Sequence, residues 1–119
     1  MSRTIYKIAE RKAWEDAVEL GVFEGAPVDK ADGYIHFSTA GQASETLEKH
    51  FAGQADLLLL AFDADAMGEE LKWEPSRGGA LFPHLYATLD PALATAEFEL
   101  VQDEDGNPMM PTEKELNAQ

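Results

Sequence analysis

The chain has 119 residues, of which 45% are hydrophobic and 27% charged, and this size and composition predict one globular domain rather than a disordered chain. It has no cysteine, which excludes disulfides, thiolate metal centres and cysteine nucleophiles. The formal net charge of −14 disfavours binding to nucleic acid or anionic membranes, and the lack of a signal-peptide pattern at the N-terminus predicts a cytoplasmic protein.

The first part of the chain predicts a strand, a helix and a loop. Residues 4–8 alternate polar and β-favouring side chains, as a strand does. Residues 10–20 repeat apolar side chains at helical spacing around Trp14, and Gly21 stands where a helix would end. Residues 21–30 mix glycine, proline and aspartate without a period, which indicates a loop.

A second strand–helix pair follows. Residues 34–38 alternate so that Tyr34, His36 and Ser38 share one face while the other face is apolar. Thr39 and Gln42 have the spacing of a capping box, in which the two residues exchange hydrogen bonds with each other's backbone. We therefore expect a helix from this cap to about residue 51.

The second half of the chain predicts strands. The apolar run 57–62 has the length of a strand buried on both faces, and we expect it at the centre of the sheet. A short strand at 71–74 should end at Pro75, because proline has no N–H for the ladder. Residues 81–87 read as an edge or bulged strand because they contain a proline, and 97–101 as the last strand.

These elements predict a single α+β domain over residues 1–102, with a mostly antiparallel or mixed sheet and two main helices. Residues 103–119 are charged, contain glycine and proline and show no period, so we expect an acidic, mobile tail. Met109 and Met110 are the positions at which this tail would contact the domain.

The first candidate for a functional site is the strand that precedes Thr39. It delivers His36 and Ser38 to the start of a helix, where free N–H groups attract a phosphate or carboxylate. The alternative is that Ser38 and Thr39 only cap the helix and that His36 is a hydrogen-bonded interior histidine.

The second candidate is the segment Trp73-Glu74-Pro75-Ser76-Arg77-Gly78-Gly79. Its glycines permit close backbone approach, and the guanidinium of Arg77 suits a carboxylate or phosphate. The alternative is a strand connection with a surface ion pair.

The third candidate is the segment around His84 and Tyr86, which project to one face of an extended chain and offer an imidazole beside a phenol. A half-buried tyrosine with a structural histidine is the alternative. No spacing motif supports a metal site that would use His36, His84 and Glu74, so we predict none.

The same residues carry a resemblance to a family. The motifs Gly-Tyr-Ile-His-Phe-Ser-Thr, Trp-Glu-x-Ser-Arg-Gly-Gly and Phe-Pro-His-Leu-Tyr resemble those of a small bacterial family of unknown function in the DUF series. That family is similar to the ADP-ribosyltransferase-like α+β fold, which implies a cleft for NAD or a related nucleotide. His36 with Ser38 and Thr39 resembles the histidine and serine–threonine elements of that fold, and Glu74 is the candidate for its glutamate.

Three functions follow as hypotheses. The first is binding of a nucleotide-like or phosphorylated small molecule by Tyr34, Ser38, Thr39, Trp73, Ser76, Arg77, Gly78, Gly79 and Tyr86. The second is transfer or hydrolysis of an ADP-ribosyl or phosphoryl group, with His36, His84 and Glu74 as catalytic residues. The third is a protein-interaction module that recruits a basic partner through its acidic surface.

Overall fold

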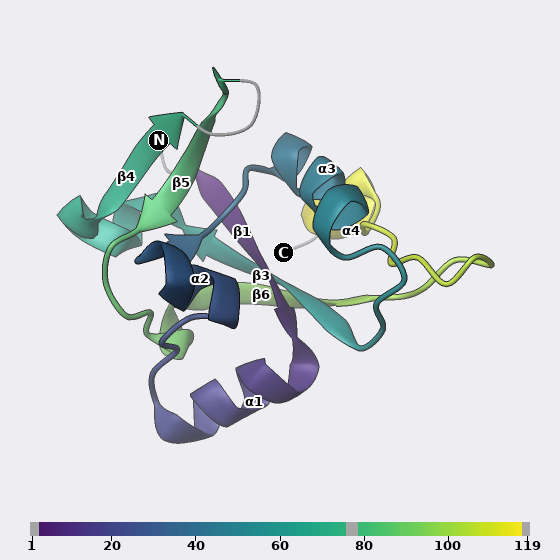
Figure 1. Cartoon of the computed structure of the whole chain (residues 1–119), viewed down its shortest axis with the longest axis horizontal. Coiled ribbons are helices and arrows are strands. Elements are labelled where there is room, and N and C mark those ends of the chain that lie inside the picture. The colour runs from purple at the N-terminus through teal and green to yellow at the C-terminus, as the bar shows by residue number, and fades with distance from the viewer. Residues whose placement is uncertain (1–2, 76–78, 118–119) are drawn as a thin grey trace.

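Two antiparallel sheets organise the chain, which the computed structural model describes over residues 3–75 and 79–117 (Figure 1). The first sheet has the order β1-β3-β6, with β1 at Thr4–Glu10, β3 at Leu57–Asp63 and β6 at Ala94–Leu100. The second has the order β2-β5-β4, with β2 at Ile35–His36, β5 at Leu81–Leu85 and β4 at Leu71–Pro75. The α+β class is confirmed, but the strands form two sheets where the sequence predicted one.

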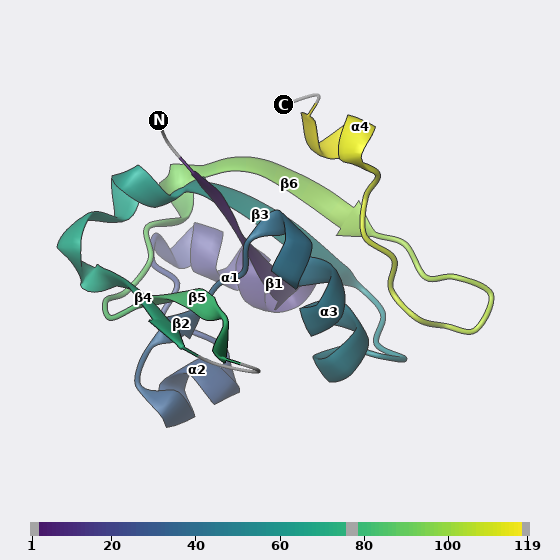
Figure 2. The same cartoon turned by 90° about the horizontal axis from the view of Figure 1, so that it is seen from above.

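The helices lie around these sheets (Figures 1 and 2). They are α1 (Arg11–Leu20), α2 (Pro27–Asp32), α3 (Ala40–His50) and α4 (Glu113–Asn117), with 3-10 segments η1 (Ala64–Glu70) and η3 (Pro91–Leu93). Helices α1 and α3 agree with the sequence, and α3 has the predicted capping box between Thr39 and Gln42.

The prediction of a loop over residues 21–30 is wrong, because α2 begins within it. The helix has six residues, too few for a helical period to be recognised. Its ends are nevertheless typical: Pro27 occupies the first turn, and Gly33 follows in the left-handed conformation at φ 88°. Both views place α2 next to β2 (Figures 1 and 2).

Strand β3 is the centre of the first sheet, as its apolar run predicted. Its side chains alternate between two hydrophobic clusters. Leu58, Leu60 and Phe62 pack with Trp14 of α1 on one face, whereas Leu57 and its alternate neighbours pack with α3 on the other. A strand that is buried on both faces needs apolar side chains throughout.

Of the two predicted placements of residues 81–87, an edge strand or a bulged strand, the edge placement is wrong, because β5 is the middle strand of the second sheet. The carbonyl of Pro83 accepts a hydrogen bond from the Phe37 amide at 3.0 Å, but proline has no N–H to return the second bond of the pair. The ladder between β2 and β5 therefore stops at His36, and β2 remains two residues long.

The C-terminal segment returns to the domain. Residue Gln102 forms a β-bridge with Pro108, and Leu116 of α4 is buried in the same hydrophobic cluster as Leu47 of α3. Met110 packs against this cluster, whereas Met109 is 47% exposed. The domain boundary at residue 102 and the mobility of the segment stay predictions. Within the described ranges, no helix is long and apolar enough to span a membrane.

Candidate functional site

The second sheet gathers polar rings on one face. Cross-strand pairing sets His36 opposite His84, and Lys72 of β4 lies opposite His84 on the other side. Glu74 is two residues beyond Lys72, so its side chain lies on the same face. We call the surface formed by Tyr34, His36, Glu74, His84 and Tyr86 the histidine–tyrosine face. The opposite face of the sheet packs into the core through Ile35 and Leu85.

His84 is the most buried residue of this face. Its Nδ1 lies 2.8 Å from Oε1 of Glu74, and the side chain is only 5% exposed. Because Nδ1 donates to the carboxylate, the neutral ring has its lone pair on Nε2. Within the described residues, no hydrogen-bond partner occupies Nε2, so this atom can accept a proton or a donor from a ligand.

Aromatic contacts order the rings around Tyr34. The Tyr34 ring stacks on His84 with centroids 4.2 Å apart and planes 23° apart. The centroid of the His36 ring lies 4.7 Å from that of Tyr34, and the centroid of the Tyr86 ring lies 5.1 Å from it. Tyr34 is half-buried and Tyr86 is 45% exposed, so the outer part of this cluster is open to solvent.

Oε1 of Glu74 also accepts a hydrogen bond from the Tyr86 hydroxyl, at 2.7 Å. This hydrogen bond raises the pKa of Tyr86 to about 12. The bonds from Tyr86 and from His84 lower the pKa of Glu74 below its ordinary value, in that order of importance. Glu74 is therefore a carboxylate and Tyr86 a neutral phenol at pH 7.

His36 lies between two carboxylates. Its Nδ1 is 2.6 Å from Oδ1 of Asp29, and its Nε2 is 2.9 Å from Oδ2 of Asp32. A carboxylate accepts and cannot donate, and only an imidazolium can donate through both nitrogens. Both ring nitrogens of His36 are therefore occupied by carboxylates, in contrast to Nε2 of His84.

Asp29 connects this face to the first sheet. It pairs with Lys7 of β1 at 2.9 Å, and the two side chains are 1% and 6% exposed. The backbone amides of Ala26 and His36 also donate to it, at 2.8 and 3.1 Å. Burial alone would raise the pKa of Asp29, but the hydrogen bond from His36 and the Lys7 ammonium outweigh it and hold the pKa well below its usual range.

Sequence reasoning missed both Lys7 and Asp29. The sequence did contain an indication that Lys7 is buried, because it stands between Tyr6 and Ile8 in a strand with apolar neighbours. A lysine that is buried in such a strand needs an anionic partner. The sequence contains 23 acidic residues, and nothing local identifies Asp29 as that partner.

Several predicted site residues have structural contacts away from this face. The Ser38 hydroxyl is 3.2 Å from Oγ1 of Thr46, and Thr39 caps α3 through Gln42. Trp73 packs on the core side of the second sheet, with the Arg3 guanidinium 4.2 Å above its ring. Gly79 is exposed, at φ 84°. Ser76, Arg77 and Gly78 lie outside the described residues.

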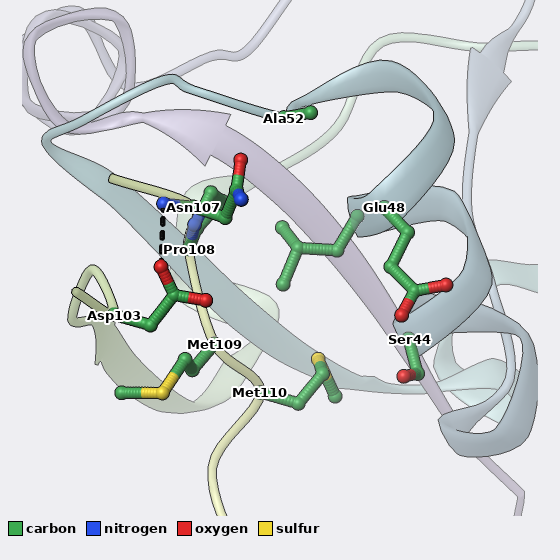
Figure 3. A pocket seen from close by; sticks show the side chains of 9 residues that line it. Ser44, Glu48, Ala52, Asp103, Asn107, Pro108, Met109 and Met110 are labelled. Carbon is green, nitrogen blue, oxygen red and sulfur yellow. Dashed lines mark hydrogen bonds between the residues drawn. The ribbon is translucent and has the colours of Figure 1, made fainter. Parts of the chain in front are cut away.

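A separate pocket of about 380 Å³ lies between α3 and the C-terminal segment (Figure 3). Ser44 and Glu48 of α3 contribute to one side, and Met109 and Met110 to the other. Oδ1 of Asp103 accepts a hydrogen bond from the backbone N–H of Asn107 at 3.0 Å, which stabilises the turn beside the pocket. The pocket contains none of the predicted site residues. No group of three or more potential metal ligands occurs within residues 3–75 and 79–117.

Comparison with known proteins assigns the chain to a family. Residues 8–96 match the family described as protein of unknown function (DUF952), and the chain belongs to it. The crystal structure of protein CC0527 from Caulobacter crescentus is 54% identical, with a TM-score of 0.86 over 89% of this chain and 93% of that one.

The solution NMR structure of the same Caulobacter crescentus protein gives a TM-score of 0.79, over 88% of this chain and 90% of that one. No curated protein matches the chain. The expected membership of a DUF family is therefore confirmed, and the family carries no assigned activity.

Proposed function

We propose that the histidine–tyrosine face binds a nucleotide-like or phosphorylated small molecule through its planar ring. The observation that carries the proposal is the stack of Tyr34 on His84, beside the exposed Tyr86. Aromatic side chains at the surface gain free energy by covering another ring. The buried Nε2 of His84 supplies a polar group that fixes orientation, as small-molecule sites require.

The anionic part of the ligand is assigned to Arg77 and its glycine neighbours, together with the segment Ser38–Thr39 at the start of α3. We also propose that the fold is ADP-ribosyltransferase-like, with NAD or a related nucleotide as the ligand. In support of this kinship, two antiparallel sheets meet where Ser38 bridges to Tyr6, close in sequence to His36. Fold kinship supports a choice of ligands to test and does not define an activity.

Calorimetry and thermal unfolding with NAD, ADP-ribose, mononucleotides and sugar phosphates test the binding proposal. A ligand that binds only the native state raises the melting temperature. We expect such a rise for at least one nucleotide, and its loss in Tyr86→Ala, which removes an exposed ring. The control is Val101→Ala, at a 64% exposed position outside the face. No binding by any compound, or equal binding in both variants, would refute the proposal.

A second candidate function is group transfer or hydrolysis at the same face. The observation in its favour is that Tyr86 and His84 both hold Glu74 as a carboxylate. A fixed carboxylate stabilises positive charge that develops at a ribose carbon in the transition state, and Nε2 of His84 can take a proton from the acceptor. Glu74→Gln should then retain binding and lose turnover of the bound nucleotide. Unchanged turnover would exclude this role.

A further inference from the structure

Charged side chains beside the histidine–tyrosine face influence which part of a ligand this face can bind. The Tyr34 ring contacts the rings of His36, His84 and Tyr86. Two carboxylates, those of Asp32 and Glu74, lie beside these rings. Oδ2 of Asp32 lies 2.9 Å from Nε2 of His36, and Oε1 of Glu74 accepts a hydrogen bond from the Tyr86 hydroxyl at 2.7 Å. Their side chains are 45% and 37% exposed, so both can contact a bound molecule.

Among the described residues, the basic side chains Lys7 and His36 near this face are bound to carboxylates of the protein. Lys7 is buried and paired with Asp29. His36 gives both nitrogens to Asp29 and Asp32. Lys72 is exposed, and its charge helps to lower the pKa of Glu74 after the hydrogen bonds from Tyr86 and His84. Asp32 and Glu74 both act on the Tyr34 hydroxyl, whose pKa is raised first by burial and then by these two charges.

A phosphate placed on these rings would approach two carboxylates, which would repel it. A positively charged planar ring would meet attraction from both carboxylates and from the faces of the tyrosines, because the π-system of an aromatic ring attracts cations. A neutral ring would gain only the stacking contact.

From these contacts we infer that the histidine–tyrosine face accepts a cationic planar ring, of the pyridinium class, in preference to a neutral ring or a phosphate. The inference deepens the proposed function and rests on it, because it states which end of a nucleotide-like ligand lies on the rings. The phosphates of such a ligand would lie beyond the face.

Two pairs of probes that differ in ring charge test the inference. The first is NAD, with a cationic nicotinamide ring, against its reduced form, with a neutral one. The second is 1-methylnicotinamide against nicotinamide, which removes the phosphates. Binding to the full chain is measured by NMR titration. We expect each cationic probe to bind roughly tenfold more tightly than its neutral partner, since cation–π and carboxylate contacts add.

Three charge variants make the test specific. Asp32→Asn and Glu74→Gln retain hydrogen-bond acceptors and should each lower the preference for the cation roughly threefold, a typical value for one exposed charge. Lys72→Gln should increase the preference, because it removes an opposing charge. Glu19→Gln, at an exposed position of α1, is the matched control and should change nothing.

The outcomes separate this inference from the proposed function. Equal affinity for both members of each pair would overturn the inference and leave nucleotide binding intact. A preference for cations that does not respond to Asp32→Asn, Glu74→Gln or Lys72→Gln would also overturn it. Preferential binding of 1-methylnicotinamide without binding of any nucleotide would support the inference and refute the proposed function. Failure of every probe to bind would overturn both.

Discussion

The two sheets have the same number of strands but are stabilised differently. In the first sheet, β3 is buried on both faces and pairs along its length with β1 and β6. The second sheet is apolar on one face only, and its β2–β5 ladder has two residue pairs. Its other face depends on ion pairs and hydrogen bonds. The polar groups therefore lie on the sheet with less burial, where side chains remain open to a ligand.

Breaking the Lys7–Asp29 pair is expected to have the largest effect on stability. Asp29→Ala leaves the Lys7 ammonium buried without an anion, which costs about 3–5 kcal/mol. Urea unfolding measures the loss. The control is Asp16→Ala in the exposed Lys12–Asp16 pair, for which we expect less than about 1 kcal/mol. Similar losses in both variants would show that the second sheet does not depend on this buried pair.

The first sheet should respond to truncation of its apolar side chains. Leu59 is fully buried in β3, and Leu59→Ala is expected to destabilise the protein by about 3 kcal/mol through lost burial and a cavity. Leu20→Ala, at a 67% exposed position, should be nearly neutral. A small effect of Leu59→Ala in urea unfolding would contradict the assignment of the main core to this sheet.

Acid should weaken the link between the sheets. The folded-state pKa of Asp29 is depressed, so its contribution is present above the unfolded-state pKa of about 3.9 and is lost as the pH falls toward the folded-state value. We expect the urea midpoint of the wild type to fall between pH 5 and pH 2 (about 3 units around that pKa). Asp29→Asn should show a smaller decrease, and an identical decrease in both proteins would exclude this role for Asp29.

Removing the N-terminal cap of α3 should lower the stability of the protein less than the substitutions in the core. Thr39→Ala removes the acceptor for the Gln42 amide, and the loss of such a cap costs about 1 kcal/mol. Thr88→Ala, an exposed threonine outside any helix, is the control for urea unfolding. A loss near zero would indicate that the hydroxyl of Thr39 has a role other than capping.

The smallest change is spectroscopic. Glu74→Gln removes the charge that accepts the Tyr86 hydroxyl, so the pKa of this phenol should fall from about 12 toward the ordinary value of about 10. Ultraviolet absorbance of tyrosinate follows the titration, and Tyr86→Phe identifies the signal. A titration of Tyr86 that is the same in wild type and Glu74→Gln would contradict the hydrogen bond at the centre of the face.

The parts of the fold that sequence predicted are those with a local pattern. The apolar run at 57–62 and the Thr39–Gln42 cap can be recognised because burial and capping impose a fixed order of neighbours. Helix α2 is too short to show a period. The position of β5 in its sheet could not be deduced, because proline favours an edge strand or a bulge, and the end of β2 beside Pro83 depends on tertiary structure.

The candidate site was predicted residue by residue but not as an arrangement. His36 and His84 were both selected, yet their placement opposite each other depends on strand pairing between distant parts of the chain. The sequence also did not show that the two histidine rings have different hydrogen-bond partners. Asp29 and Asp32 occupy both nitrogens of His36, whereas Glu74 occupies one nitrogen of His84. Charge pairing between separate elements leaves no trace in residue spacing.

The pairing of β4 with β5 favours stepwise formation of the histidine–tyrosine face during folding. Glu74 and His84 lie on these adjacent strands and Tyr86 directly follows β5, so their contacts join residues that are close in sequence. Tyr34 and His36 join only after a long loop has closed. We expect the Glu74–His84–Tyr86 half to assemble early and the stacked half late, so a ligand that needs both halves would bind only to fully folded chains.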